Sequence, residues 1–275
     1  MTAAEFCLDG KVILITGGAG LIGAEICDAY AAYGATVILC DIAAQDKLDI
    51  QATALRARYP NSQVVPVQTD ITSEGSVSAL FDTVRVLCGK LDVLVNLAAI
   101  DAKFDDRANE INPTRFESYP LAFWDQSVAV NCTGLIRVTQ AAMRMMLPRK
   151  CGNIINVAST YALVAPNQGL YRIRGEEGQA FKPVDYVATK SMIPNLTRYM
   201  ATLYAGHGIR CNCIVPHGVF SNHQSEFLEN FSRLSPMGRM CNVKELRGPF
   251  VFLASDASSY MTGSMLVVDG GWTAW

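Results

Sequence analysis

A glycine-rich turn separates the first apolar segment of the chain from the helical segment that follows it. Residues 11–16 read KVILIT, a continuous β-branched run typical of a strand buried on both faces. Gly18, Gly20 and Gly23 then have the spacing G-x-G-x-x-G at the start of an expected helix over 21–33. Glycines allow the backbone to approach a pyrophosphate closely, and free N–H groups at a helix start favour its negative charge. The turn therefore predicts a dinucleotide site, whose expected contacts here are Gly17, Gly20, Leu21, Ile22 and Gly23.

Asp41 ends the second apolar segment, 18 residues after the last glycine of the turn. A carboxylate at about this distance accepts hydrogen bonds from the ribose hydroxyls of NAD, and its charge repels the 2′-phosphate of NADP. Residues 42–45 read IAAQ and contain no arginine to pair with such a phosphate. The sequence therefore predicts NAD as the cofactor, although an aspartate at a strand end can also cap the next turn.

Apolar runs of strand length alternate with longer segments of helical periodicity along the whole chain. This alternation is typical of a parallel sheet with crossover helices. The length of 275 residues, without internal repeats or low-complexity linkers, favours one domain over two. We therefore expect a single-domain α/β Rossmann fold over residues 1–275, a doubly wound parallel sheet of about seven strands flanked by helices. The expected strands are 11–16, 36–40, 63–68, 91–96, 153–158, 209–215 and 265–268.

Long polar stretches interrupt this alternation. Loops of such length inside a compact domain are usually functional, although a solvated excursion is the simpler alternative. Substrate loops are expected at about 105–120, 161–185 and 217–240. The second holds several charged side chains, among them Arg172, Arg174 and Lys182.

Composition excludes several classes of function. Half of the residues are hydrophobic and 17% are charged, unlike the composition of a disordered chain. The net charge of −2 is too balanced for a nucleic-acid partner. No apolar run approaches the roughly 20 residues of a membrane helix, and the first ten residues lack the basic start of a secretory signal. We therefore expect a cytoplasmic protein without nucleic-acid or membrane partners.

Nine cysteines are scattered through the chain without a Cys-x-x-Cys pair. Cys211 and Cys213 alternate across an expected strand, so they cannot both face one metal ion. In a reducing compartment such cysteines are expected to be free and mostly buried thiols. No metal site is predicted.

Tyr186 and Lys190 stand four residues apart in the sequence YVATK, which places them on one face of a helix. Asp185 before them could cap that helix. A phenol with a pKa near 10 is a weak base at neutral pH, and lowering its pKa by about three units requires about 4 kcal/mol of phenolate stabilisation. Lys190 and an oxidised nicotinamide could supply it. Alone this pair is common on helix surfaces; beside a dinucleotide turn it predicts proton transfer.

With these two motifs the chain resembles the short-chain dehydrogenase/reductase family, in its short single-domain branch, over nearly its whole length. Further matches follow in order along the sequence: Asp70-Ile71, the segment 96–99 (NLAA), Asn131, Ser159, the segment 216–221 (PHGVFS) and the tail 268–271 (VDGG).

The resemblance implies roles for the matched residues. Tyr186 would be the general acid/base, and Lys190 would lower its pKa and hold the nicotinamide ribose. Ser159 would orient the reacting oxygen of the substrate, and Asn131 would hold a water that links Lys190 to solvent. The implied cofactor contacts also include Asp70 and Ile71 at the adenine, Asn96 and Ala98 along the cofactor, and Val219 at the carboxamide.

The sequence departs from the family pattern at three places. Leu21 stands where the short branch usually has glycine, so the turn looks like that of the longer branch of sugar-nucleotide epimerases and dehydratases. Leu97 and Ala99 replace two residues of the usual Asn-Asn-Ala-Gly motif. His217 replaces the glycine of the usual Pro-Gly, which predicts a ring that either points toward the substrate or caps the strand.

Two reaction types remain open. The 27-residue gap between Ser159 and Tyr186, together with Leu21, suits an epimerase or dehydratase that retains its NAD. The end of the chain at Trp275 leaves little room for a further substrate domain and favours a dehydrogenase that transfers a hydride between a secondary alcohol or ketone and nicotinamide. A non-catalytic NAD-binding regulator is disfavoured, because the Ser, Tyr and Lys set is intact.

Polar side chains near the expected nicotinamide end suggest the substrate. Arg172, Arg174 and His217 are the candidate contacts, and they suit a small polar substrate such as a sugar, sugar acid, sugar phosphate or polyol. Aromatic residues over 116–124 could instead line an apolar pocket, so a 3-oxoacyl or ketone reductase stays open. The resemblance further implies a homo-oligomer, either a tetramer or a dimer.

Overall fold

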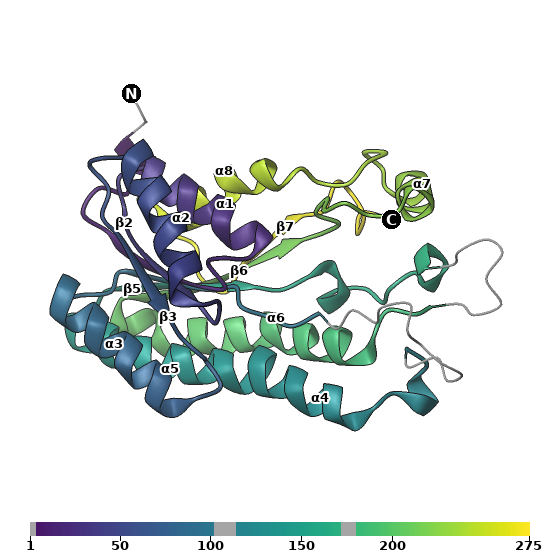
Figure 1. Cartoon of the computed structure of the whole chain (residues 1–275), viewed down its shortest axis with the longest axis horizontal. Coiled ribbons are helices and arrows are strands. Elements are labelled where there is room, and N and C mark those ends of the chain that lie inside the picture. The colour runs from purple at the N-terminus through teal and green to yellow at the C-terminus, as the bar shows by residue number, and fades with distance from the viewer. Residues whose placement is uncertain (1–3, 102–113, 172–179) are drawn as a thin grey trace.

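The computed structural model describes residues 4–101, 114–171 and 180–275, and its strands form one sheet (Figure 1). The strand order is β3-β2-β1-β4-β5-β6-β7, and every neighbouring pair is parallel. The predicted Rossmann architecture is confirmed, with strand bounds within two residues of those expected from the sequence. The strands are β1 (Val12–Thr16), β2 (Thr36–Asp41), β3 (Val64–Gln68), β4 (Val93–Asn96), β5 (Gly152–Val157), β6 (Ile209–Pro216) and β7 (Met265–Val268).

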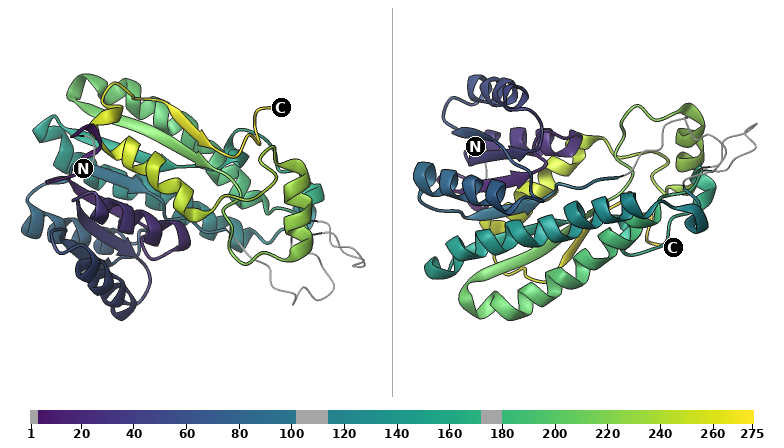
Figure 2. Two further views of the ribbon diagram at one scale, coloured as in Figure 1. Left: turned by 90° about the horizontal axis from the view of Figure 1, so that it is seen from above. Right: turned by 60° about the horizontal axis from the view of Figure 1, so that its bottom comes forward.

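Helices cover both faces of the sheet (Figures 1 and 2). One layer holds α1 (Leu21–Ala32), α2 (Gln45–Arg58) and α8 (Arg247–Ala254); the other holds α3 (Glu74–Cys88), α4 (Leu121–Ser127), α5 (Leu135–Met146) and α6 (Val184–Tyr204). Helix α7 (Ser225–Leu234) stands at the end of the molecule away from the N-terminus. Short helical turns are η1 (Ala4–Phe6), η2 (Phe116–Ser118), η4 (Leu147–Arg149), η5 (Thr160–Ala162), η6 (Gln168–Tyr171), η7 (Ala205–His207), η8 (Val243–Leu246) and η9 (Asp256–Ser258), and η3 (Val128–Gly134) is π-helical. Among the described residues, no helix has the length and apolar character needed to cross a membrane.

The alternation of side chains along β1 divides the core into two layers. All five residues of β1 are buried, as expected for a central strand of a doubly covered sheet. Ile13 and Ile15 pack with the layer of α1, α2 and α8, whereas Leu14 packs with the layer of α3 and α5. Because successive side chains point to opposite faces, one continuous apolar run supplies both cores.

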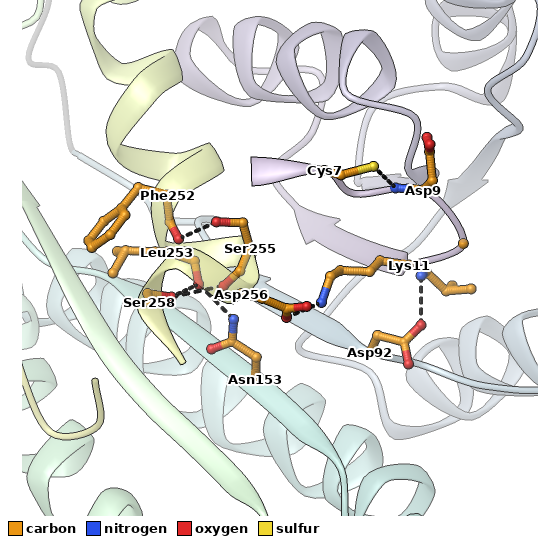
Figure 3. A network of polar contacts seen from close by, with 12 residues as sticks. Cys7, Asp9, Lys11, Asp92, Asn153, Phe252, Leu253, Ser255, Asp256 and Ser258 are labelled. Atoms are coloured by element: carbon orange, nitrogen blue, oxygen red, sulfur yellow. Dashed lines mark hydrogen bonds and ion pairs between the residues drawn. The ribbon is translucent and has the colours of Figure 1, made fainter. Parts of the chain in front are cut away.

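A polar network lies at the end of the sheet where the strands begin (Figure 3). Lys11 Nζ lies 2.7 Å from a carboxylate oxygen of Asp256, and the Val12 amide donates to Asp92 across 2.9 Å. The Asn153 side-chain amide donates to the Leu253 carbonyl, 2.7 Å away, which ties β5 to α8. These contacts provide partners for polar groups at the amino ends of the strands. The carboxyl ends of the strands, on the opposite side, carry the candidate site described below.

An aromatic cluster supports the loops beyond the carboxyl edge of the sheet. The His217 ring lies 4.3 Å from the Trp272 ring and 5.2 Å from that of Phe231, measured between centroids. Its Nδ1 is hydrogen-bonded to the Thr160 hydroxyl, and the residue is buried. Burial lowers the pKa of His217 to about 4, against the opposing effect of the Asp269 carboxylate.

The turn before α1 depends on close backbone packing at Gly23. A Cβ on Gly23 would lie 2.0 Å from the Gly17 carbonyl oxygen, which is backbone and cannot rotate away. We expect Gly23→Ala to lower the free energy of unfolding by about 1 to 3 kcal/mol, the usual cost of overpacking, as measured by urea denaturation. Gly75→Ala is the matched control, because a Cβ there meets nothing within 4 Å. Equal stability of the two variants would contradict this account of the turn.

The buried His217 should make stability depend on pH. Below its ordinary pKa of about 6.5 the unfolded chain binds a proton that the folded chain does not, so stability falls as the pH drops from about 6.5 to about 4. Over this window the wild type should lose roughly 3 kcal/mol more than His217→Phe, which keeps a ring but cannot titrate. Urea unfolding at several pH values measures the difference. The exposed His207→Gln variant is the control, and identical pH slopes for wild type and His217→Phe would refute the argument.

Candidate active site

The carboxyl ends of the strands bring the predicted cofactor residues together where the strand order reverses, between β1 and β4. The backbone at Gly17 has φ +73°, and a Cβ there would come within 2.9 Å of the Ala98 Cα. The Thr16 hydroxyl oxygen accepts hydrogen bonds from the amides of Leu97 and Ala98 at 3.1 and 3.2 Å. The glycine turn and the segment after β4 therefore form one surface, which only a residue without a side chain allows.

The start of α1 fits a phosphate. Gly20 precedes the helix and has no side chain to occupy the first amides, and Leu21 is half exposed beside it. Such amides are available to an anionic group. The departure at Leu21 therefore leaves the helix start open.

Asp41 is held beside this turn by two backbone donors. The Ala19 amide donates to Oδ2 at 2.9 Å and the Ala43 amide donates to Oδ1 at 3.0 Å. The carboxylate therefore does cap its own turn, yet each oxygen retains a further acceptor site. Its orientation is fixed without a ligand, and it fits a pair of ribose hydroxyls.

Asp70, Ile71 and Asn96 are further expected contacts of the adenine or the rest of the cofactor, and their side chains have different surroundings. Asp70 accepts from the amide and the hydroxyl of Thr72, at 2.8 and 2.7 Å, in the turn before α3. Ile71 is buried against η3 at Gly134. Asn96 is buried as well, and its amide donates to side-chain oxygens of Thr139 and Asn156, both at 2.9 Å. The Asn96 side chain therefore joins β4 to α5 and β5.

Ser159, Tyr186 and Lys190 meet at the same edge. Ser159 follows β5 and precedes η5, and Tyr186 and Lys190 lie one turn apart near the start of α6. Lys190 Nζ donates to the Val157 carbonyl at 2.8 Å and lies 5.8 Å from the centre of the Tyr186 ring. The predicted shared helix face of Tyr186 and Lys190 is thus present in the fold.

Burial opposes both charged forms at this site. It raises the pKa of Tyr186 well above its usual value, Asp101 raises it further, and the hydrogen bond with Ser159 acts in the opposite direction. Burial also lowers the pKa of Lys190, to about 8. The phenol is therefore protonated at neutral pH in the protein alone, and phenolate formation needs an additional positive charge.

Asn131 lies in the π-helical turn η3 and is buried. Its amide donates to the Ile100 carbonyl and to the Thr189 hydroxyl, both at 3.0 Å, and its carbonyl accepts from the Ile100 amide at 2.7 Å. Asn131 therefore links the segment after β4 to α6, which it contacts at Thr189, the residue before Lys190. Short π-helical turns frequently occur at functional sites.

Asp185 does not precede the helix as a cap, because α6 begins at Val184 with Pro183 as the cap residue. Its side chain is fully buried and accepts a hydrogen bond from the Ser127 hydroxyl at the end of α4. This contact ties the start of α6, where Tyr186 lies, to the neighbouring helix.

The expected substrate loops lie beyond these residues. The Phe181 amide donates to the Thr114 hydroxyl at 2.9 Å, so the described ends of the first two loops meet. The Tyr171 and Phe227 rings lie 5.8 Å apart, which joins the second loop to α7 of the third. Val219, in the third loop, forms an isolated β-bridge with Cys241, the residue just after that loop.

The proposed substrate contacts have different positions. His217 is buried in the aromatic cluster, and its ring lies 5.8 Å from that of Tyr161 in η5, the turn that follows Ser159. Arg172 and Arg174 lie outside the described residues. Asp101, the fifth residue after β4, was not predicted as a site residue, yet it pairs with Lys182 beside Tyr186. The only signal in the sequence was an acidic residue following the apolar segment 97–100.

Comparison with known proteins agrees with this geometry. Residues 18–273 match the protein family described as enoyl-(acyl carrier protein) reductase. The chain is 32% identical to the D-threitol dehydrogenase of Mycolicibacterium smegmatis, covering 98% of this chain and 95% of that protein. It is 33% identical to the L-tagatose-forming galactitol 2-dehydrogenase of Cereibacter sphaeroides, covering 98% of each.

Solved structures show the same fold. A gluconate 5-dehydrogenase from Burkholderia cenocepacia, in complex with NADP and tartrate, superposes with a TM-score of 0.84 at 28% identity, over 98% of both chains. A short-chain dehydrogenase from Leptospira borgpetersenii with bound NAD+ gives a TM-score of 0.83 at 30% identity, over 99% of this chain and 96% of that one. These matches agree with the glycine turn and with the set of Ser159, Tyr186 and Lys190. The chain therefore belongs to the short-chain dehydrogenase/reductase family.

Proposed function

We propose that this chain is an NAD-dependent oxidoreductase that interconverts a secondary alcohol and a ketone in a small polyol or sugar-type substrate. The observation that carries the proposal is the meeting of Ser159, Tyr186 and Lys190 at the sheet edge that also holds the glycine turn and Asp41. The substrate class is supported by the two relatives whose names are those of polyol dehydrogenases. A homo-oligomeric assembly and a cytoplasmic location stay predictions.

The reaction needs one group that accepts a proton when the alcohol is oxidised and donates it when the ketone is reduced. In the oxidation direction the Tyr186 phenolate oxygen would take the proton of the substrate hydroxyl, and in reduction the phenol would return that proton to the ketone oxygen. The Ser159 hydroxyl would hold the same substrate oxygen. A bound nicotinamide dinucleotide would accept the hydride from the carbinol carbon, or donate it in reduction. Lys190, released from the Val157 carbonyl, would place its charge beside the phenolate and stabilise it.

The choice of NAD rests on Asp41. The relatives in solved structures hold either NADP or NAD+, so family membership leaves the choice open. In this chain the Asp41 carboxylate is fixed at the end of β2 by the amides of Ala19 and Ala43. A 2′-phosphate placed against it would meet a like charge, whereas ribose hydroxyls would find a hydrogen-bond acceptor.

Removing the phenol hydroxyl tests the proton-transfer role. Tyr186→Phe should lower kcat for polyol oxidation by about 100- to 10,000-fold, the usual contribution of a general acid/base, while NAD binding measured by calorimetry persists. NAD reduction with D-threitol, galactitol and xylitol is the assay. Tyr199→Phe is the matched control, because this tyrosine lies on the same helix and is exposed. Full activity of Tyr186→Phe would remove Tyr186 from the mechanism.

Removing the carboxylate tests the cofactor assignment. Asp41→Ala should reduce the preference for NAD over NADP in kcat/KM by roughly tenfold or more, because a hydrogen-bonding group for the ribose and a repulsive charge are both lost. Asp82→Ala removes an exposed carboxylate on α3 and serves as the control for net charge. If the ratio of the two cofactors did not change in Asp41→Ala, another residue would have to select the cofactor.

A further inference from the structure

An ion pair lies directly beside the candidate acid/base. Lys182 Nζ is 2.6 Å from both carboxylate oxygens of Asp101 and 4.3 Å from the centre of the Tyr186 ring. Lys182 comes from the segment that leads into α6, and Asp101 comes from the segment after β4. The pair therefore joins the two segments that border the Tyr186 phenol.

The two partners differ in exposure. The Lys182 side chain is only 10% exposed, whereas that of Asp101 is 43% exposed. The ammonium is covered by Asp101 and by the rings of Tyr186 and Tyr161, the latter centred 5.9 Å away. A carboxylate has about four acceptor positions, and one ammonium group does not fill them. Among the described residues, Lys182 is the donor to this carboxylate, so Asp101 presents further acceptor positions at an accessible surface next to the site.

The negative charge of Asp101 affects the pKa values of three tyrosines. It contributes to raising the pKa of Tyr186, of Tyr161 and of Tyr171. Because Lys182 Nζ lies 4.3 Å from the centre of the Tyr186 ring and 2.6 Å from the Asp101 carboxylate, a substrate oxygen held by the phenol would have its neighbouring carbons near this ion pair. An apolar group there would cover a charged pair without hydrogen bonding to it, which is unfavourable, whereas hydroxyl groups can donate to the carboxylate.

We propose that Asp101 and Lys182 form a hydroxyl-binding subsite, in which the Asp101 carboxylate accepts hydrogen bonds from substrate hydroxyls next to the reacting carbon. Lys182 is a positioning residue that holds the carboxylate in place. The subsite rests on the proposed function and deepens it, because it selects polyhydroxylated alcohols over alcohols with a single hydroxyl.

The test compares a polyol with a simple secondary alcohol. In Asp101→Asn the ratio of kcat/KM for galactitol to that for cyclohexanol, with NAD+, should fall about 10- to 100-fold, as expected when a hydrogen bond to a charged group is weakened. Lys182→Met should lower the same ratio, and the double variant should lose less than the product of the single losses, because the two residues act together. Asp256→Asn breaks a surface ion pair at the opposite sheet edge and should leave the ratio unchanged (Figure 3).

A binding measurement separates recognition from turnover. In the Tyr186→Phe background with NAD+, calorimetry should show galactitol binding about tenfold or more weaker once Asp101→Asn is added. Equal losses for galactitol and cyclohexanol in kcat/KM, or an unchanged galactitol Kd, would overturn the subsite while leaving the polyol oxidoreductase intact. If the wild type oxidised cyclohexanol but neither oxidised nor bound galactitol, D-threitol or xylitol, the proposed substrate class itself would be wrong, and the subsite with it.

Discussion

The close approach of two backbones, at the glycine turn and at the segment after β4, is the constraint on which the candidate site depends. Gly17 leaves no room for a side chain against Ala98, and Thr16 accepts hydrogen bonds from Leu97 and Ala98. The same segment continues to Ile100, whose amide and carbonyl are both held by Asn131. Asn131 in turn bonds to Thr189 on α6. A continuous set of contacts thus runs from the expected phosphate site to the helix that carries Tyr186 and Lys190.

The electrostatics of the site follow from its burial. The pKa of Tyr186 is raised, so its phenolate is disfavoured in the protein alone, whereas Lys190, with a pKa lowered to about 8, keeps its proton at neutral pH. A positively charged cofactor beside them would favour the phenolate. This dependence couples proton transfer to cofactor binding. Asp101 adds a negative charge that opposes phenolate formation, and its partner Lys182 lies 4.3 Å from the centre of the Tyr186 ring.

Local patterns in the chain were sufficient for the strands, the glycine turn and the pair Tyr186 and Lys190. These features depend on neighbours within a few residues, such as continuous apolar runs in β1 and a four-residue spacing in α6. Three features could not be read in this way. Asp101 and Lys182 are 81 positions apart, η3 adopts π-helical geometry around Asn131, and His217 packs against Trp272. Each depends on segments that only the folded chain brings together.

Periodicity and short motifs are local properties of the chain, so they were enough to predict the class of fold, the position of the glycine turn and the residues proposed for proton transfer. Which polar side chains remain available to a ligand depends on the packing of the folded chain. It directed Asn96 and Asn131 into buried hydrogen bonds, enclosed His217 among aromatic rings, and left the Asp101 carboxylate accessible beside Tyr186. The reason is physical: burial and hydrogen-bond partners are set by contacts between distant segments, and these contacts decide whether a polar group holds the fold together or is available to a ligand.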